Sequence, residues 1–116
     1  MIPVILESPY AGDVETNEAY ARACMADCLQ RGEAPFASHL LYPQPGVLDD
    51  TDPSERTKGI VAGFAWRSMA TRTVVYHDLG ISAGMRAGLA HASAIGSVIE
   101  YRNLARWPLG QWVDNV

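Results

Sequence analysis

A turn rich in small residues, which joins an apolar run to an alanine-rich segment, is the feature that most constrains the fold. The apolar run spans residues 73–76, and the turn spans residues 78–88. This order of residue types predicts a strand, a loop and a helix in succession. A second turn of this kind, residues 7–13, follows the apolar residues 4–6. Two strand-to-helix turns in one short chain predict that both line a single pocket.

The remaining segments continue this alternation of strands and helices. We expect strands at residues 4–6, 34–41, 71–78 and 98–102, and helices at residues 14–31, 53–69 and 82–95. Gly32 suits the end of the first helix, and Asp52, Pro53 and Glu55 suit the start of the second as a cap, a first helical residue and a carboxylate that reaches back to the cap. The pattern predicts right-handed crossovers and a small flavodoxin-like or Rossmann-like three-layer α/β sandwich with a four- to five-stranded, mostly parallel sheet.

Length and composition predict one globular domain. The chain has 116 residues, of which 48% are hydrophobic, and we expect a single domain over residues 1–104. Residues 105–116 then form a tail, which contains Trp107 and Trp112 and is expected to pack on the domain or on a neighbouring subunit. The net charge of −4, with scattered basic residues, argues against a nucleic acid polymer as partner. No apolar run reaches the ~20 residues of a membrane span, so we expect a cytoplasmic protein without a membrane partner.

The cysteines do not predict a metal site. Cys24 and Cys28 lie four residues apart on one expected helix, but no second pair of cysteines or histidines accompanies them at zinc-site spacing. We therefore expect two buried thiols, no bound metal and no resident cofactor.

The loops that follow the expected strands carry the candidate ligand-binding residues, because open parallel sheets bind ligands at the carboxyl ends of their strands. Ser82, between Gly80 and Gly84, either caps its own helix or binds an anionic group such as a phosphate, and both roles are compatible. The turn is neither a Walker loop nor a dinucleotide fingerprint. Ser8, Pro9 and Tyr10 place a hydroxyl and a ring on the first turn.

The other loops add further candidates. Asp49 is expected to bind ribose hydroxyls while Asp52 caps the helix, and Arg56 either meets a phosphate or pairs with a nearby carboxylate. Tyr10 either stacks on a planar base or packs on the sheet edge. The ligand-binding residues predicted from the sequence are Ser8, Pro9, Tyr10, His39, Asp49, Arg56, Asp78, Ser82, Gly84 and Met85.

Five short segments together carry a resemblance to a known group of proteins. They are residues 8–13 (SPYAGD), 38–42 (SHLLY), 48–50 (LDD), 53–56 (PSER) and 82–85 (SAGM). With these segments the chain resembles small, mostly phage- and prophage-borne proteins of unknown function, which are similar to the nucleoside 2-deoxyribosyltransferase superfamily. The resemblance covers residues 4–102, and it implies a flavodoxin-like sheet in an oligomer with pockets at subunit contacts.

One position departs from the pattern of that superfamily. The transferases and many of their relatives carry a nucleophilic Glu four residues after the glycine of the turn, where this chain has Gly88. Glycosyl transfer normally needs a carboxylate, so either Glu7 or Asp78, at the ends of two expected strands, would have to supply it. Gly88 also implies room for a ligand larger than a simple nucleoside.

These features lead to one main functional hypothesis and two alternatives. The main hypothesis is that the chain binds a nucleotide-like small molecule without turnover, in a phage setting as an anti-defence protein that sequesters a nucleotide signal of the host. The first alternative is a deoxyribosyltransferase or N-glycosidase, and the second is a protein-interaction module with a vestigial pocket. We also expect a homo-oligomer, a dimer or higher, because Trp66 lies off the apolar stripe of Ile60, Val61, Phe64 and Ala65 and would meet a second subunit or Trp107.

Overall fold

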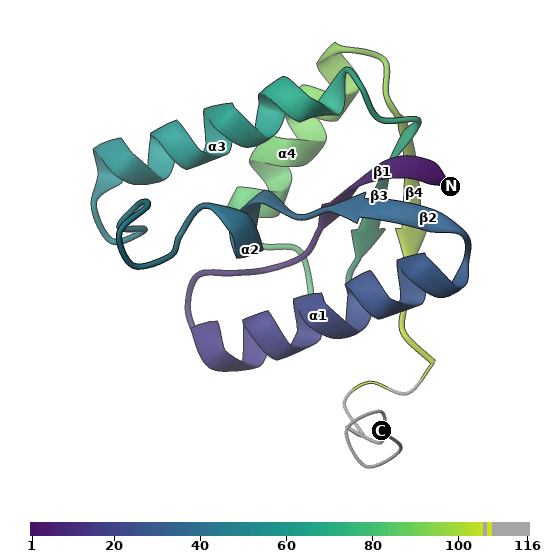
Figure 1. Ribbon diagram of the computed structural model, residues 1–116, viewed down its shortest axis with the longest axis horizontal. Coiled ribbons are helices and arrows are strands. Elements are labelled where there is room, and N and C mark those ends of the chain that lie inside the picture. Colours follow the sequence, from purple (N-terminus) through teal and green to yellow (C-terminus); the bar gives the residue numbers. More distant parts are fainter. Residues whose placement is uncertain (106, 108–116) are drawn as a thin grey trace.

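The computed structural model describes residues 1–105 and Trp107, and over these residues it is a three-layer α/β sandwich. Its elements are β1 (Ile2–Glu7), α1 (Val14–Gln30), β2 (Glu33–Phe36), α2 (Ser38–Leu41), α3 (Pro53–Arg67), β3 (Arg72–Tyr76), α4 (Ala83–Ala94) and β4 (Val98–Arg102). The strands of the described chain form one four-stranded sheet in the order β2-β1-β3-β4, and every neighbouring pair is parallel. In Figure 1, α1 covers one face of the sheet while α3 and α4 cover the other. The predicted fold class is confirmed.

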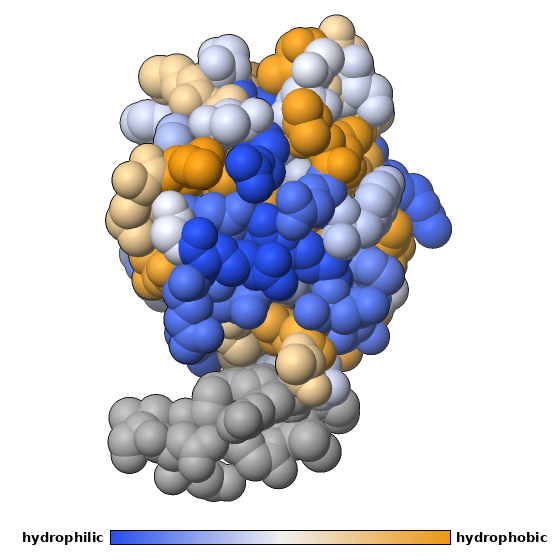
Figure 2. All heavy atoms as spheres, turned by 90° about the vertical axis from the view of Figure 1, so that its right-hand side faces the viewer, coloured by the Kyte–Doolittle hydropathy of each residue, from blue (hydrophilic) through white to orange (hydrophobic). Residues whose placement is uncertain are grey.

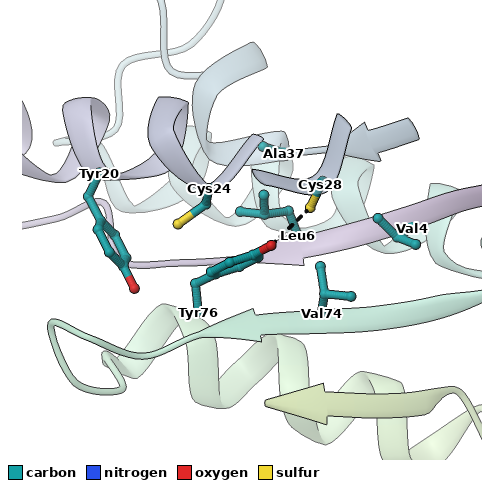
Figure 3. Close-up of a cluster of buried hydrophobic side chains, with 8 residues drawn as sticks. All are labelled: Val4, Leu6, Tyr20, Cys24, Cys28, Ala37, Val74 and Tyr76. Carbon is teal, nitrogen blue, oxygen red and sulfur yellow. Dashed lines mark hydrogen bonds between the residues drawn. The ribbon is translucent and has the colours of Figure 1, made fainter. Parts of the chain in front are cut away.

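The alternation of side chains along the two central strands divides the interior between the two faces. Val4 and Leu6 of β1 and Val74 and Tyr76 of β3 point toward α1, where they pack against Tyr20, Cys24, Cys28 and Ala37 (Figure 3). The intervening residues, among them Ile5, Thr73 and Val75, face α3 and α4. Both cysteines are buried and free, as predicted, and burial raises the pKa of the Cys28 thiol to about 11.

The helix ends confirm most of the predicted caps. The Asp52 carboxylate accepts hydrogen bonds from the backbone N–H groups of Ser54 and Glu55 at 2.9 and 3.3 Å. Gly32, after α1, has the left-handed φ of 78° that suits a glycine. The predicted return of the Glu55 carboxylate to Asp52 is wrong, because Oε1 of Glu55 accepts from the backbone N–H of Asp49 at 3.2 Å instead.

The second strand is shorter than predicted. It ends at Phe36, the last residue that pairs with β1, and residues 38–41 form the short helix α2 instead of continuing the strand to residue 41. The carbonyl of Ala37 accepts hydrogen bonds from the N–H groups of Leu40 and Leu41, which closes a helical turn. A short apolar run has no period that separates a strand from a turn of helix, and that ambiguity is the source of the error.

A network of ion pairs joins β2, β3 and β4 on the α1 face of the sheet, where Arg102 also contacts Tyr76 and Cys28. Arg102 is buried and holds the buried Glu33 through two hydrogen bonds of 2.7 and 2.6 Å. Arg72 adds ion pairs to Glu33 and Glu100 at 3.4 and 3.8 Å. Figure 2 shows hydrophilic residues gathered on the side of the molecule that lies beyond the start of β1 and the edge strand β4. The positive charges of Arg72 and Arg102 are thus neutralised by the carboxylates of Glu33 and Glu100.

The segment after β4 folds back on α1. The Asp78 carboxylate accepts hydrogen bonds from the Tyr20 hydroxyl at 2.5 Å and from the backbone N–H of Leu104 at 2.9 Å. The ring of Trp107 packs edge-on against Tyr20, with the centroids 4.9 Å apart. This part of the predicted tail thus packs on the domain, while Trp112 lies outside the described residues.

Trp66 does not meet Trp107. Its ring packs on Phe36 with the centroids 5.2 Å apart, and its indole N–H donates to the Tyr42 hydroxyl at 3.0 Å. The predicted apolar stripe of α3 is also partly wrong, because Val61 and Ala65 are exposed.

In the described part of the chain, no helix is long and apolar enough to cross a membrane.

Candidate functional site

A cavity of about 370 Å³ lies at the carboxyl edge of the sheet, between the α2–α3 segment on one side and the β1 loop and the start of α4 on the other. Its apolar walls include Phe36, Leu48, Ile60, Phe64 and Met85. Its polar and charged lining includes Glu7, Ser8, His39, Asp50, Glu55, Arg56, Arg67 and Ser82. Apolar walls with a few convergent polar groups are typical of a small-molecule site.

Glu7, the last residue of β1, brings a carboxylate to this cavity. The strand alternation places it on the α3 and α4 face together with Ile5. Nη2 of Arg67 donates to Oε2 of Glu7 at 2.6 Å, while the other two nitrogens of Arg67 donate to Thr73 at 2.7 Å and to His91 at 3.0 Å. Burial raises the pKa of Glu7, although the Arg67 guanidinium lowers it in part.

Gly88 of α4 is the reason that the Glu7 carboxylate fits here. A Cβ atom at residue 88 would lie 2.5 Å from Cδ and 2.7 Å from Oε1 of Glu7, distances at which atoms overlap. The glycine found where the resemblance implies a Glu therefore makes room for a carboxylate that comes from β1. Oε1 of Glu7 has no hydrogen-bond partner among the described residues, so it can accept a hydrogen bond from a ligand.

Ser8 and His39 form a second polar pair in the cavity lining. The Ser8 hydroxyl and Nε2 of His39, which α2 supplies, lie 2.6 Å apart. Burial lowers the pKa of His39 to about 4, so the imidazole is neutral at pH 7. The helix α2 reaches this position because α3 carries Gly63 beside it, where a Cβ atom would lie 2.7 Å from Oγ of Ser38. The pair offers uncharged hydrogen-bonding groups.

The start of α4 contributes a positively polarised rim. Oγ of Ser82 accepts from the backbone N–H of Met85 at 3.2 Å, so Ser82 caps α4 and also lines the cavity. Arg56 is close by, because a Cβ atom at Gly84 would lie 3.7 Å from its Nη2. Its Nη1 makes a 3.3 Å ion pair with Asp50. A helix amino terminus beside an arginine favours an anion.

The structure brings most of the predicted site residues together. Those that line the cavity are Glu7, Ser8, Tyr10, His39, Arg56, Ser82, Gly84 and Met85. Pro9, Asp49 and Asp78 are not among the residues that line it, so the expectation that Asp49 and Asp78 lie around this cavity is not met. Pro9 is itself buried beside the cavity.

Asp49 and Asp78 have structural partners instead. Oδ1 of Asp49 accepts from the backbone N–H and the hydroxyl of Thr51 at 2.9 and 2.6 Å, and the neighbouring Asp50 takes the position at the cavity. Asp78 binds Tyr20 and Leu104 on the α1 side of the sheet. Of the two carboxylates expected to replace the missing Glu, Glu7 and Asp78, only Glu7 lines the cavity.

Sequence reasoning missed several residues of the lining. Arg67 gave no signal, because an arginine in the last turn of a helix normally interacts with the helix dipole at the surface. Phe36 was assigned to a strand, but no face of the sheet was predicted for its side chain. Nothing around Gly63 in the sequence indicated that α2 packs closely against it. Phe64 was placed on the apolar stripe of its helix, and that stripe could have indicated a cavity wall as well as core.

The fold and the cavity define a small α/β protein with a ligand-sized site at the carboxyl edge of a parallel sheet. A family model described as a domain of unknown function (DUF7768) matches residues 2–102, and the chain belongs to this family. No curated protein and no solved structure matches the chain. Among the described residues there is no cluster of three or more His, Cys, Asp or Glu side chains that could hold a metal ion.

Proposed function

We propose that the protein binds a nucleotide-like small molecule in the cavity at the carboxyl edge of its sheet. The observation that carries the proposal is the combination, in about 370 Å³, of apolar walls and convergent polar groups. Ligand sites commonly measure about 300–1,000 Å³, and open parallel sheets bind their ligands at this edge. The side chains of Phe64 and Met85 offer apolar surface for a planar base.

The polar groups suit the other parts of a nucleotide. Oε1 of Glu7 can accept hydrogen bonds from sugar hydroxyls, and Arg56 with the start of α4 can bind a phosphate. The neutral pair of Ser8 and His39 can form hydrogen bonds with the edge of a base. The arrangement thus provides an acceptor, a cation and an uncharged pair around one apolar space.

We favour binding without turnover. The resemblance places the nucleophile of the superfamily at residue 88, and this chain has Gly88 there. A protein that binds a nucleotide-like molecule and leaves it intact lowers the free concentration of that molecule. In the phage setting that the resemblance implies, this activity would sequester a nucleotide signal of host defence.

The test is to incubate the protein with nucleosides, nucleotides and cyclic ADP-ribose-type compounds, remove unbound material, and analyse the protein fraction by chromatography before and after denaturation. Intact compound released only on denaturation supports the proposal, and the absence of any retained compound contradicts it. Arg56→Gln should reduce retention of phosphate-bearing compounds. Arg86→Gln is the matched control, since Arg86 is exposed on α4 and does not line the cavity.

A second candidate function is cleavage of an N-glycosidic bond, with Glu7 as the carboxylate. The specific observation is that Gly88 leaves room for this side chain and that its Oε1 is without a protein partner among the described residues. In such a step the bond between the anomeric carbon and the base nitrogen breaks. The carboxylate stabilises the positive charge of the sugar or forms an ester with it, and water completes hydrolysis.

The same chromatography distinguishes this candidate, because cleavage releases a free base. Glu7→Gln should then abolish base release while the compound is still retained. Base release that is unchanged in Glu7→Gln contradicts the role of Glu7.

A further inference from the structure

The charges that line the cavity limit how much negative charge a ligand can bring. We infer that the cavity accepts a nucleotide with at most one phosphate group and discriminates against diphosphates and triphosphates. This inference rests on the proposed function and adds the number of phosphates to it.

Carboxylates outnumber cations in the described lining of the cavity. Glu7, Asp50 and Glu55 each contribute a carboxylate, while Arg56 and Arg67 contribute the positive charges and no lysine takes part. Three acids against two arginines give the lining a formal charge of −1 before any ligand enters. An anionic ligand therefore depends on a cation that is free to meet it.

Arg67 is not available for that purpose. Its side chain is only 2% exposed, and its nitrogens already donate to Glu7, Thr73 and His91. A phosphate would have to displace the 2.6 Å bond to Glu7, and would thereby leave a carboxylate without its counter-ion in a buried place. The positive charge of Arg67 is thus neutralised by Glu7 within the protein.

Arg56 is the cation of the described lining that can meet a phosphate. Its side chain is 36% exposed, and its ion pair with Asp50 is long, at 3.3 Å. One phosphate can share this guanidinium, because arginine binds phosphate through two parallel hydrogen bonds. In the described lining, the remaining charged groups that a second or third phosphate can meet are carboxylates, with Asp50 and Glu55 nearest in sequence to Arg56, and like charges at short distance repel.

The loops also lack the usual means of binding polyphosphates. Such sites combine a glycine-rich loop with a lysine that reaches the outer phosphates, as in the Gly-Lys-Ser/Thr motif. The strand-to-helix turns of this chain, residues 7–13 and 78–88, contain no lysine. The absence of a lysine from these turns and the excess of carboxylates in the lining both disfavour a ligand with more than one phosphate.

The experiment is a titration of the full chain by isothermal calorimetry with adenosine, AMP, ADP and ATP, and with the matching guanosine series, at about 0.15 M salt, where surface charges are partly screened. We expect the monophosphate to bind at least as tightly as the nucleoside. We expect the triphosphate to bind at least about tenfold more weakly than the monophosphate.

Variants of the acidic residues test the cause. Glu55→Gln and Asp50→Asn each remove one negative charge from the lining. Each should reduce the difference in affinity between the monophosphate and the triphosphate. Glu15→Gln is the matched control, because it makes the same change at an exposed residue of α1 outside the lining and should leave the gap unchanged. Circular dichroism of each variant checks that it is folded.

The outcomes separate this inference from the proposed function. If a triphosphate binds as tightly as its monophosphate, the inference is overturned while the proposed function stands. If no compound of either series binds but a cyclic ADP-ribose-type compound is retained in the chromatography test, the inference alone is overturned. If no compound in either experiment binds, both are overturned. A gap that narrows equally in the Glu15→Gln variant assigns the effect to net charge and also overturns the inference.

Discussion

Replacement of Gly88 by Ala should destabilise the protein, although alanine is the better helix former. The added methyl group would lie 2.5 Å from Cδ of Glu7, so the carboxylate must move and its 2.6 Å bond to the buried Arg67 must break. Breaking a buried ion pair by removing one partner costs about 3–5 kcal/mol, and the lower end applies because Arg67 keeps its bonds to Thr73 and His91. Alanine returns up to about 1 kcal/mol of helix propensity. The expected net loss is about 2 kcal/mol.

Urea denaturation followed by circular dichroism measures this loss, with Gly84→Ala as the matched control on the same helix. A Cβ atom at Gly84 would lie 3.7 Å from Arg56, an ordinary contact, so that variant should be as stable as the parent or slightly more stable. If Gly88→Ala is as stable as Gly84→Ala, the packing of Glu7 on Gly88 is not as described. Glu7 of β1 would then not be the carboxylate that fills the space beside Gly88.

Three further predictions concern other parts of the molecule. The Arg102 guanidinium lowers the pKa of Glu33 in the folded protein. The ion pair therefore stabilises the fold fully above the unfolded-state pKa of about 4.3, and this stabilisation is lost as the pH falls through the lower pKa that Glu33 has in the folded protein. Glu33→Gln should therefore cost about 3 kcal/mol in urea denaturation at pH 7, and a deficit that does not shrink in acid would contradict the pairing. Ser82→Ala should weaken a phosphate-bearing ligand by about 1–2 kcal/mol in calorimetry, whereas unchanged affinity would leave Ser82 as a helix cap alone. We propose that the chain forms a homo-oligomer whose second copy completes the open side of the cavity, and a sedimentation mass equal to the 12.6 kDa of one chain at micromolar concentration would rule this out.

The fold was predictable because its signals are local and agree with one another. The apolar runs of the central strands, the cap at Asp52 and the glycine at residue 32 each indicate the same alternation of strands and helices, and the parallel sheet follows from that alternation. The short segment 38–41 was mistaken for strand, because four apolar and polar residues carry no usable period.

The candidate site was predictable in position but not in all its members. The rule that ligands bind at the carboxyl ends of parallel strands placed Glu7, Ser8 and Ser82 at one cavity. It could not distinguish Asp49 from Asp50, although the Thr51 that lies two residues after Asp49 is typical of an Asx turn and indicates a structural role.

The features of the site that the sequence could not predict depend on packing between residues far apart in the chain. Asp78 stands at a strand end as Glu7 does, yet it bonds to Tyr20 from α1, and nothing near Asp78 in the sequence indicates that partner. The contact between Gly88 and Glu7 joins residues 81 positions apart, and only the packing of α4 against β1 shows it.

The most direct test of the proposed binding site is a nuclear magnetic resonance titration of the ¹⁵N-labelled protein with AMP. We expect backbone chemical shifts to change around the cavity, at Ser8, His39, Ser82 and Met85, and to saturate as AMP is added. Residues of the ion-pair cluster formed by Glu33, Arg72, Glu100 and Arg102 should remain unchanged. Shifts confined to that cluster, or no shifts at millimolar AMP, would contradict the account.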